Sequence, residues 1–174
     1  MKNLQKISFI LLIFFSIKSL VVADTPFFLD FKYILNESDA GKKAQSFLKK
    51  KLEGGIKSLK DKESKIQEEE KKLIQQKKVI SAEDYKKKVS ELRSKVISLQ
   101  KERNQLLETV SKQRTKARNE LLKNLNPIIR DYMKQKQIRM VIDKKNLLVA
   151  EDSLDITKDI MALLNNKLKS IKLN

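Results

Sequence analysis

The sequence contains no cysteine, no histidine and no tryptophan among its 174 residues. The missing cysteine excludes disulfides and thiolate metal sites, and the missing histidine removes the commonest transition-metal ligand and general acid or base. No Gly-rich phosphate loop and no metal-ligand spacing is present, and no local motif pairs a serine with an activating lysine. The sequence therefore predicts a protein that is not an enzyme and that uses no cofactor and no metal.

Glycine, proline and aromatic residues are also scarce, with three Gly, two Pro and 6% aromatic residues. Few positions remain for loops, and a 35% charged, Lys-rich composition is typical of long helices or coiled coils. Residues 40–137 hold 28 Lys and Arg against 13 Asp and Glu, a net charge of +15. The rest of the chain after Ala23 holds 8 and 9, a net charge of −1. The positive charge of the protein thus belongs almost wholly to one stretch.

Residues 1–23 have the pattern of a secretory signal peptide. Lys2 and Lys6 precede an apolar segment at residues 7–17, and Ala23 offers a small residue for cleavage. The alternative is an uncleaved membrane anchor. Lys18 interrupts the segment, which is also shorter than the ~20 residues that a spanning helix needs. We expect export and cleavage after Ala23.

The segments on either side of the basic stretch predict a small β body. Residues 25–31 form an apolar run after a proline and indicate a strand, followed by a connector at 32–39 in which Ser38 or Asp39 can cap a helix. Residues 138–143 alternate like a half-buried strand, 144–146 suit a turn, and 147–150 suit another strand. Asp155 can cap a last helix, whose apolar residues would be Ile156, Ile160, Leu163, Leu164, Leu168 and Ile171.

Within the basic stretch the apolar residues repeat every seven positions. In the first half one core row is apolar and the companion row is largely charged, which makes half of a coiled-coil seam. The apolar row is Leu52, Leu59, Ile66, Leu73 and Ile80; the companion row is Ile56, Glu63, Glu70 and Lys77. The second half continues the repeat at Tyr85, Leu92, Leu99 and Leu106, with Val89, Val96, Arg103, Val110 and Ala117 between them.

A helix-start signal interrupts this repeat at residues 80–85. The Ser81 hydroxyl can accept from the Asp84 amide, while Asp84 can reach back to the Ser81 amide, and Ile80 and Tyr85 flank the pair as a hydrophobic staple. We therefore expect the chain to reverse here. Folding it back about Ser81 brings apolar residues level with one another in alternate layers: Leu73 with Val89, Ile66 with Val96, and Leu52 with Val110. A helix of about 40 residues makes an arm of roughly 60 Å.

Three residues are candidate hinges in this arm. Gly54 and Gly55 lie within the first helix, where each glycine costs about 1 kcal/mol relative to alanine. They are either a tolerated weak spot or a hinge about which the arm swings. Pro127 removes a hydrogen bond from the return helix and favours a kink there.

The order of strand, long helical hairpin, strands and helix resembles the Skp (OmpH-like) family of periplasmic chaperones. The similarity spans essentially the whole chain after the signal. It is carried by FLDFKYILNESDAGKKAQ at residues 28–45, ISAEDYKKKV at 80–89 and MVIDKKNLLVAEDSLDIT at 140–157. The sequence departs from the family at Gln137 and Ile138, where relatives often have a glycine and an aromatic residue, and its arm is unusually rich in lysine.

The resemblance implies an α+β, mostly α fold: a jellyfish-like homotrimer with long antiparallel helical hairpins, the coiled-coil arms, on a small β body. Residues 40–137 would form the arm, with its tip near 80–85, and residues 24–39 and 138–174 the trimerising body with its C-terminal helix. It also implies ATP-independent holding, in the periplasm, of unfolded outer-membrane proteins between the arms. The lipopolysaccharide site described in the family finds no residue-by-residue match here.

A run of lysines is usually a solvated helix face, but an excess of +15 on one hairpin implies anionic partners. We expect unfolded outer-membrane proteins as clients, with lipopolysaccharide or anionic lipid as further candidates, and the export signal argues against nucleic acid. The alternative function is a structural coiled-coil scaffold or linker of the cell envelope. A diffuse client-binding surface is predicted at Lys71, Lys72, Lys77, Lys78, Lys86, Lys87, Lys88 and Arg93, beside the tip cap of Ser81 and Asp84.

Overall fold

The computed structural model describes residues 25–173, so the predicted signal peptide at 1–23 lies outside the described residues. The elements are, in order, β1 (Phe27–Leu29), α2 (Phe31–Glu37), α3 (Asp39–Gln76), α4 (Ala82–Lys136), β2 (Val141–Asp143), the short 3-10 helices η1 (Lys144–Asn146) and η2 (Asp152–Leu154), and α5 (Thr157–Lys167). The protein is mostly helical with one small sheet, which confirms the predicted α+β class.

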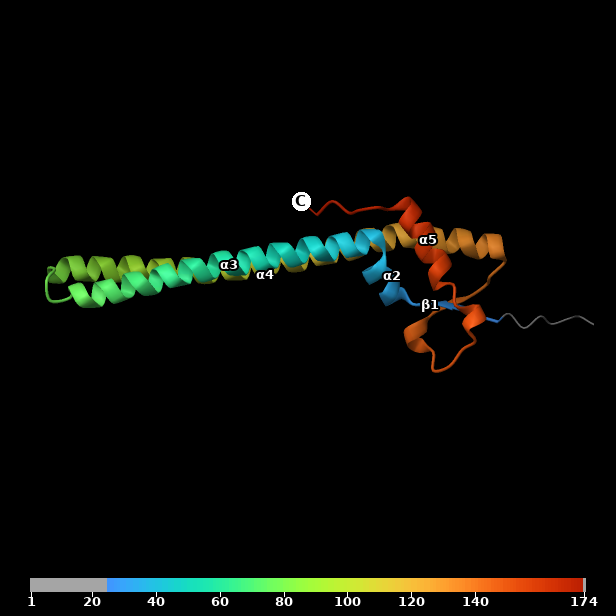
Figure 1. The fold of residues 1–174 in the computed structure, drawn as a ribbon, viewed down its shortest axis with the longest axis horizontal. Coiled ribbons are helices and arrows are strands. Elements are labelled where there is room, and N and C mark those ends of the chain that lie inside the picture. Colours follow the sequence, from blue (N-terminus) through green and yellow to red (C-terminus); the bar gives the residue numbers. More distant parts are fainter. Residues whose placement is uncertain (1–24, 174) are drawn as a thin grey trace, which may run out of the picture.

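The long helices α3 and α4 run antiparallel and make a thin arm that projects from one end of the molecule (Figure 1). The pairing agrees with the predicted reversal about Ser81, because Lys77 lies 5.8 Å from the ring centre of Tyr85 and Leu52 packs on the cluster that contains Val110. We use "arm" for residues 40–137 and "body" for residues 25–39 and 138–173. Helix α4 is the longer of the two and continues past the start of α3 into the body (Figure 1).

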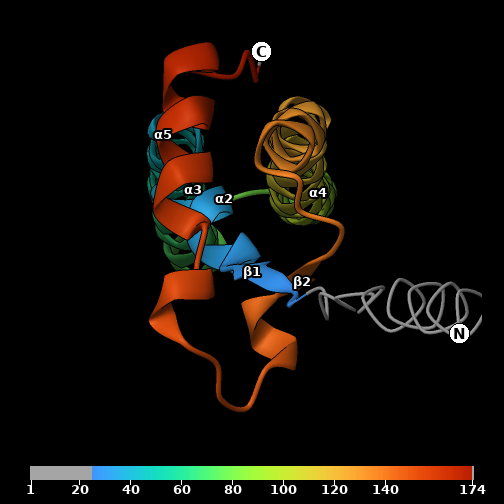
Figure 2. The ribbon, with the colours of Figure 1, turned by 90° about the vertical axis from the view of Figure 1, so that its right-hand side faces the viewer.

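The body is organised around a two-stranded parallel sheet in which Phe27 pairs with Val141 and Leu29 with Asp143. Parallel neighbours need a crossover connection, and here the entire arm is that connection. The segment before α5 closes the body, since the Ile156 amide donates to the Phe28 carbonyl at 2.9 Å. Viewed along the arm, α5 stands on one side and α4 on the other, with the strands below both (Figure 2).

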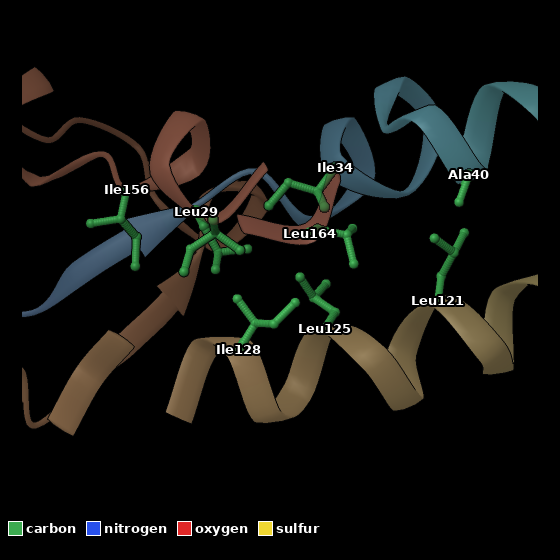
Figure 3. Packing of buried hydrophobic residues seen from close by; sticks show 9 residues of the cluster. Leu29, Ile34, Ala40, Leu121, Leu125, Ile128, Ile156 and Leu164 are labelled. Carbon is green, nitrogen blue, oxygen red and sulfur yellow. The ribbon is translucent and has the colours of Figure 1, made fainter. Parts of the chain in front are cut away.

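One buried apolar cluster joins the body to the end of α4. Leu125 and Ile128 of α4 point toward α5 and β1, and Leu121 faces Ala40 at the start of α3 (Figure 3). Fully burying a leucine or isoleucine contributes about 1.5–3 kcal/mol each. The members are Leu29, Ile34, Ala40, Leu121, Leu125, Ile128, Ile156, Ile160 and Leu164.

The corner between α2 and α3 explains the first glycine of the chain. Ser38 is fully buried, ends α2 and caps α3, where its hydroxyl accepts from the Gly41 amide at 3.2 Å. A Cβ atom at Gly41 would lie 2.1 Å from the carbonyl oxygen of Leu35. Only glycine therefore allows the two helices to meet so closely.

Two predictions about the first 15 described residues were wrong in part. The predicted strand 25–31 is shortened to Phe27–Leu29, and the predicted connector 32–39 is largely the helix α2. The cause is Asp30, whose carboxylate accepts from the Tyr33 amide at 2.7 Å and caps a helix that begins at Phe31. This N-cap signal was present in the sequence.

The elements after the arm also differ from their predictions. The strand at 138–143 is reduced to Val141–Asp143, and residues 147–150 form no strand, with Leu148 99% and Val149 88% exposed. A strand needs a neighbour for its backbone groups, and none of the described residues provides one there. Helix α5 ends at Lys167, so Leu168 and Ile171 lie beyond it. Its N-cap position is Ile156, while the Asp155 carboxylate accepts from the Thr157 amide at 2.9 Å.

Candidate functional site

The seam of the arm is buried in only part of its length. Toward the tip, Leu59 and Leu73 of α3 are buried, whereas Ile66, Leu92 and Leu99 are half-buried. Other large apolar side chains of the two helices and of the turn between them face outward. The exposed ones are Phe47, Ile56, Ile74, Val79, Val96, Ile97 and Leu107. A pair of helices thus leaves an interrupted apolar surface along its sides.

Ion pairs connect the helices where the seam is charged. Lys62 pairs with Glu102, Lys95 with Glu69 at 2.5 Å, and Arg103 with Glu63 at 3.8 Å. All of these side chains are about half exposed, so each pair contributes no more than about 1 kcal/mol. These pairs therefore add little to the stability of the hairpin, and their main contribution is to favour one register of α3 against α4.

A shallow apolar groove lies between two of these ion pairs. Ile66 and Leu99 line it, with Ser98 beside them, and the pairs Lys62–Glu102 and Lys95–Glu69 bound its sides. Its volume is about 280 Å³. The groove offers apolar contact ringed by both signs of charge, and it is open to solvent along the arm.

The tip is built by the capped turn. Ser81 is the N-cap of α4, and its hydroxyl accepts from the Asp84 amide at 3.0 Å. The Asp84 carboxylate accepts from the Ser81 hydroxyl at 2.7 Å rather than from the Ser81 amide, so the reciprocal bond expected from the sequence is replaced. Two acidic residues in the first turn, Glu83 and Asp84, also suit the positive end of the helix dipole.

All eight cations of the predicted client-binding surface are exposed and gather on both sides of this tip. Lys77 lies over the Tyr85 ring, and Lys88 donates to the Gln76 side chain at 3.0 Å. Residues 71–93 carry these eight cations against three carboxylates. The other six form no ion pair with any residue of the described range: Lys71, Lys72, Lys78, Lys86, Lys87 and Arg93.

The two glycines predicted as a hinge are not equivalent. A Cβ at Gly54 would meet nothing within 4 Å, whereas a Cβ at Gly55 would lie 2.5 Å from a methyl carbon of Leu106. Gly55 therefore lets α3 and α4 approach closely at this layer. Helix α3 runs through both glycines and α4 through Pro127 without a break in either helix.

The base of the arm holds residues that sequence reasoning missed. After α5, residues 168–173, here called the strap, run back along the arm (Figure 1). Leu173 is 3% exposed and packs in a second buried cluster with Ala44, Leu48, Val110 and Ala117. The Gln113 side-chain amide of α4 donates to the Leu173 carbonyl at 2.5 Å. The alternation of Ile171 and Leu173 was the only signal in the sequence.

Hydrogen bonds shift the pKa values of two titratable groups near α5, Tyr132 and Asp155. A hydrogen bond to Asp159 raises the pKa of Tyr132 to about 12. Burial opposes the ionisation of Asp155, yet hydrogen bonds from Thr157 and Lys144 lower the pKa of its carboxyl. The Tyr132–Asp159 bond ties α5 to α4, and the Lys144–Asp155 ion pair ties the start of α5 to the segment after β2.

Two further classes of site were searched for within residues 25–173. No group of three or more acidic residues could hold a metal ion there. No helix of this range combines the length and apolar character needed to cross a membrane.

Comparison with known proteins adds two findings. The sequence profile of the family described as outer membrane protein (OmpH-like) matches residues 27–164. The fold is similar to a crystal structure of a candidate outer membrane chaperone (OmpH-like) from Caulobacter crescentus CB15, with a TM-score of 0.79 and 19% identity, over 85% of this chain and 89% of that one. No curated protein matches the sequence.

Proposed function

The chain belongs to the OmpH-like outer membrane protein family, and from that premise we propose that it is an ATP-independent holdase chaperone of the periplasm. Its clients are unfolded outer-membrane β-barrel proteins, which it holds between basic arms so that they do not aggregate. The predicted cleavage after Ala23 delivers it to that compartment. The chaperone description of the Caulobacter protein supports the proposal.

The proposal rests on the arm, whose apolar side chains are only partly buried between its two helices. Exposed apolar side chains such as Ile74, Val79 and Ile97 lie among cations, most of which form no ion pair with any described residue. Each contact buries little apolar surface, at about 25 cal/mol per Å², so one contact is weak. Many such contacts along an arm add up and tolerate almost any client sequence. Folding of the client removes the apolar surface that is held, so release needs no nucleotide.

We further propose the jellyfish-like homotrimer as the working form. Within residues 25–173 the outer edge of β2 has no partner strand and that of β1 carries a single bridge, between Phe28 and Asp155, while Leu148 and Val149 are exposed. Exposed edges are sites at which another chain can add strands. Three copies would bury these groups and place three arms, each with a net charge of +15, around one positive cavity.

Anionic amphiphiles are a second class of partner that we propose for the tip. The cluster of unpaired lysines with exposed Val79 at its centre suits phosphate groups next to acyl chains, as in lipopolysaccharide or anionic lipid. We propose no role in binding nucleic acid.

The test is the suppression of aggregation. An unfolded outer-membrane β-barrel protein is diluted from urea into buffer with and without the mature protein, in the absence of nucleotide, and light scattering is followed at low and moderate salt. We expect scattering to fall in proportion to the chaperone added, with partial loss of the effect at moderate salt because screening weakens the charged contacts. Scattering that is unchanged at both salt concentrations would contradict the proposal. An envelope scaffold would behave in that way, since it would bind one folded partner and ignore unfolded chains.

A further inference from the structure

The strap covers an apolar surface on α3 and α4 at the base of the arm, which we call the groove. Leu168 has extended backbone angles, and Ile171 and Leu173, two residues apart, both pack inward. Lys172 between them is exposed. A period of two is the pattern of a β-strand laid on an apolar surface. The floor of the groove is formed by Ala44 and Leu48 of α3 and by Val110 and Ala117 of α4.

The strap makes a hydrogen bond with only one of the two polar atoms of the Gln113 side chain. The Gln113 side chain donates to the Leu173 carbonyl, but its Oε1 atom is buried and has no hydrogen-bond partner in the described range. Burial of an unpaired acceptor is unfavourable. An amide side chain can bind a peptide group through both of its atoms, so a segment in a slightly different register would supply the missing N–H.

Charge also leaves the strap short of an optimal fit. The strap carries Lys169 and Lys172 and no acid. Lys169 reaches Asp39 at 3.4 Å, but Lys172 is exposed and has no ion pair in the described range. Because the flanking stretches of α3 and α4 are rich in cations, a segment with an acidic residue in place of Lys172 would have the more favourable charge. The unpaired cations of this part of the arm include Lys43, Lys50, Arg114 and Lys116.

We propose that this groove is a binding site for extended polypeptide segments with apolar residues at every second position, and that the strap covers it until such a segment displaces it. The inference rests on the proposed function for the identity of the ligand, because strands of membrane β-barrels alternate apolar and polar residues in this way. The strap is then an internal stand-in for a client strand. It keeps the groove from exposing apolar surface while no client is present.

The probe is a fluorescent peptide in which apolar residues (Ile and Leu) alternate with polar residues (Glu and Thr). Fluorescence anisotropy measures its binding to the full mature chain. Ile171→Asn and Leu173→Asn together release the strap without changing the net charge, and Ser170→Asn, at an exposed position between them and α5, is the matched control. If the strap covers the groove nine-tenths of the time, the released variant binds the probe about tenfold more tightly than the parent, whereas the control binds like the parent. A peptide of the same composition with its apolar residues adjacent should gain little.

Equal affinity of parent and released variant would overturn the proposal. A second experiment covers the case in which the released variant fails to fold, as circular dichroism would show. The chain has no cysteine, so cysteines in place of the exposed Lys172 of the strap and the exposed Lys116 of α4 can be joined by a flexible cleavable thiol crosslinker. Joining them should abolish probe binding, and cleaving the crosslinker should restore it. Binding that is unaffected by the crosslink would also overturn the proposal.

These outcomes separate the groove from the function. If the parent chain suppresses aggregation but neither strap experiment changes probe binding, the proposed site fails and the holdase proposal stands. If the parent chain does not suppress aggregation but strap release still raises probe affinity, the groove binds extended peptides and the holdase proposal fails.

Discussion

At Gly54 and Gly55 two identical neighbouring residues have different surroundings. Gly54 has open space at its Cβ position, so Gly54→Ala should stabilise the arm by about 1 kcal/mol through helix propensity. Gly55→Ala places a methyl group against Leu106 and should lower stability by about 1–3 kcal/mol relative to Gly54→Ala. Thermal unfolding by circular dichroism measures both. Equal shifts in melting temperature would show that the close approach at Gly55 has no energetic importance.

Tyr132 gives the protein a pH dependence in the alkaline range. Its hydrogen bond to Asp159 raises the pKa of the phenol from 10.0 to about 12, so the folded state favours the neutral form. This stabilisation is complete below pH 10 and is lost as the pH rises through 12. Tyr132→Phe should therefore melt at a lower temperature than the parent below pH 10, and the difference should disappear toward pH 12. Tyr33→Phe, at an exposed position, is the control, and curves that stay parallel up to pH 12 would contradict the assignment.

At the scale of the element, Leu73 and Ile74 of α3 separate stability from binding. Leu73 is 7% exposed in the seam, whereas its neighbour Ile74 is 61% exposed. Leu73→Ala should cost at least about 2 kcal/mol of stability, while Ile74→Ala should leave the melting temperature nearly unchanged. If the open side of the arm holds clients, Ile74→Ala should instead weaken the suppression of aggregation. Full suppression by the Ile74 variant would argue against a role for this exposed row.

The lysines of the tip predict a salt-sensitive step in client capture. Lys78→Gln with Lys87→Gln removes two exposed cations near the tip, and Lys123→Gln with Lys158→Gln removes two exposed cations nearer the body. We expect the first pair to slow capture of an acidic client in stopped-flow fluorescence and to reduce its dependence on salt, because steering follows local charge. The second pair should have a smaller effect. Equal effects of the two pairs would point to net charge alone.

Individual elements show how far the sequence could be read. The reversal at Ser81 was predictable, because the seven-residue repeat and a local cap indicate it within one pattern. The register was predicted only in part, since Val96, expected opposite Ile66, is 50% exposed and Ile66 lines a groove with Leu99. The helix α2 was missed because its single good signal, Asp30, lies inside the apolar run at 25–31 that predicted a strand. Residues 147–150 have strand composition but find no partner strand in the described range, and partners are a tertiary property.

The candidate site was predictable in its charge and not in its contacts. The exposed lysines of the tip follow from composition, because unpaired lysines stay in water. The close contact of Gly55 with Leu106 and the seating of Leu173 near Gln113 depend on which residues meet across the hairpin. A helical pattern was assigned to Leu168 and Ile171, although the chain leaves the helix at Lys167 and continues extended.

For the whole molecule, the arm and the body have different relations to the proposed function. The body shares one compact apolar cluster with the end of α4, and the outer edge of β2 has no partner strand within residues 25–173; both features suit assembly with further copies. Between Leu48 and Val110 the arm buries only Leu59 and Leu73, and it carries many exposed apolar and basic groups. Clients would therefore meet the arms, and the body would set how many arms surround a client.

Native mass spectrometry tests most directly whether a trimer holds an unfolded client. The mature protein is mixed with an unfolded outer-membrane β-barrel protein in the absence of nucleotide. We expect a trimer when the protein is alone and a complex of three copies with one client chain when the client is present. The same client, folded beforehand in detergent micelles, should not form the complex. A monomer that carries no client, or a complex that forms equally with the folded barrel, would contradict the central claim that three half-open arms hold an unfolded chain.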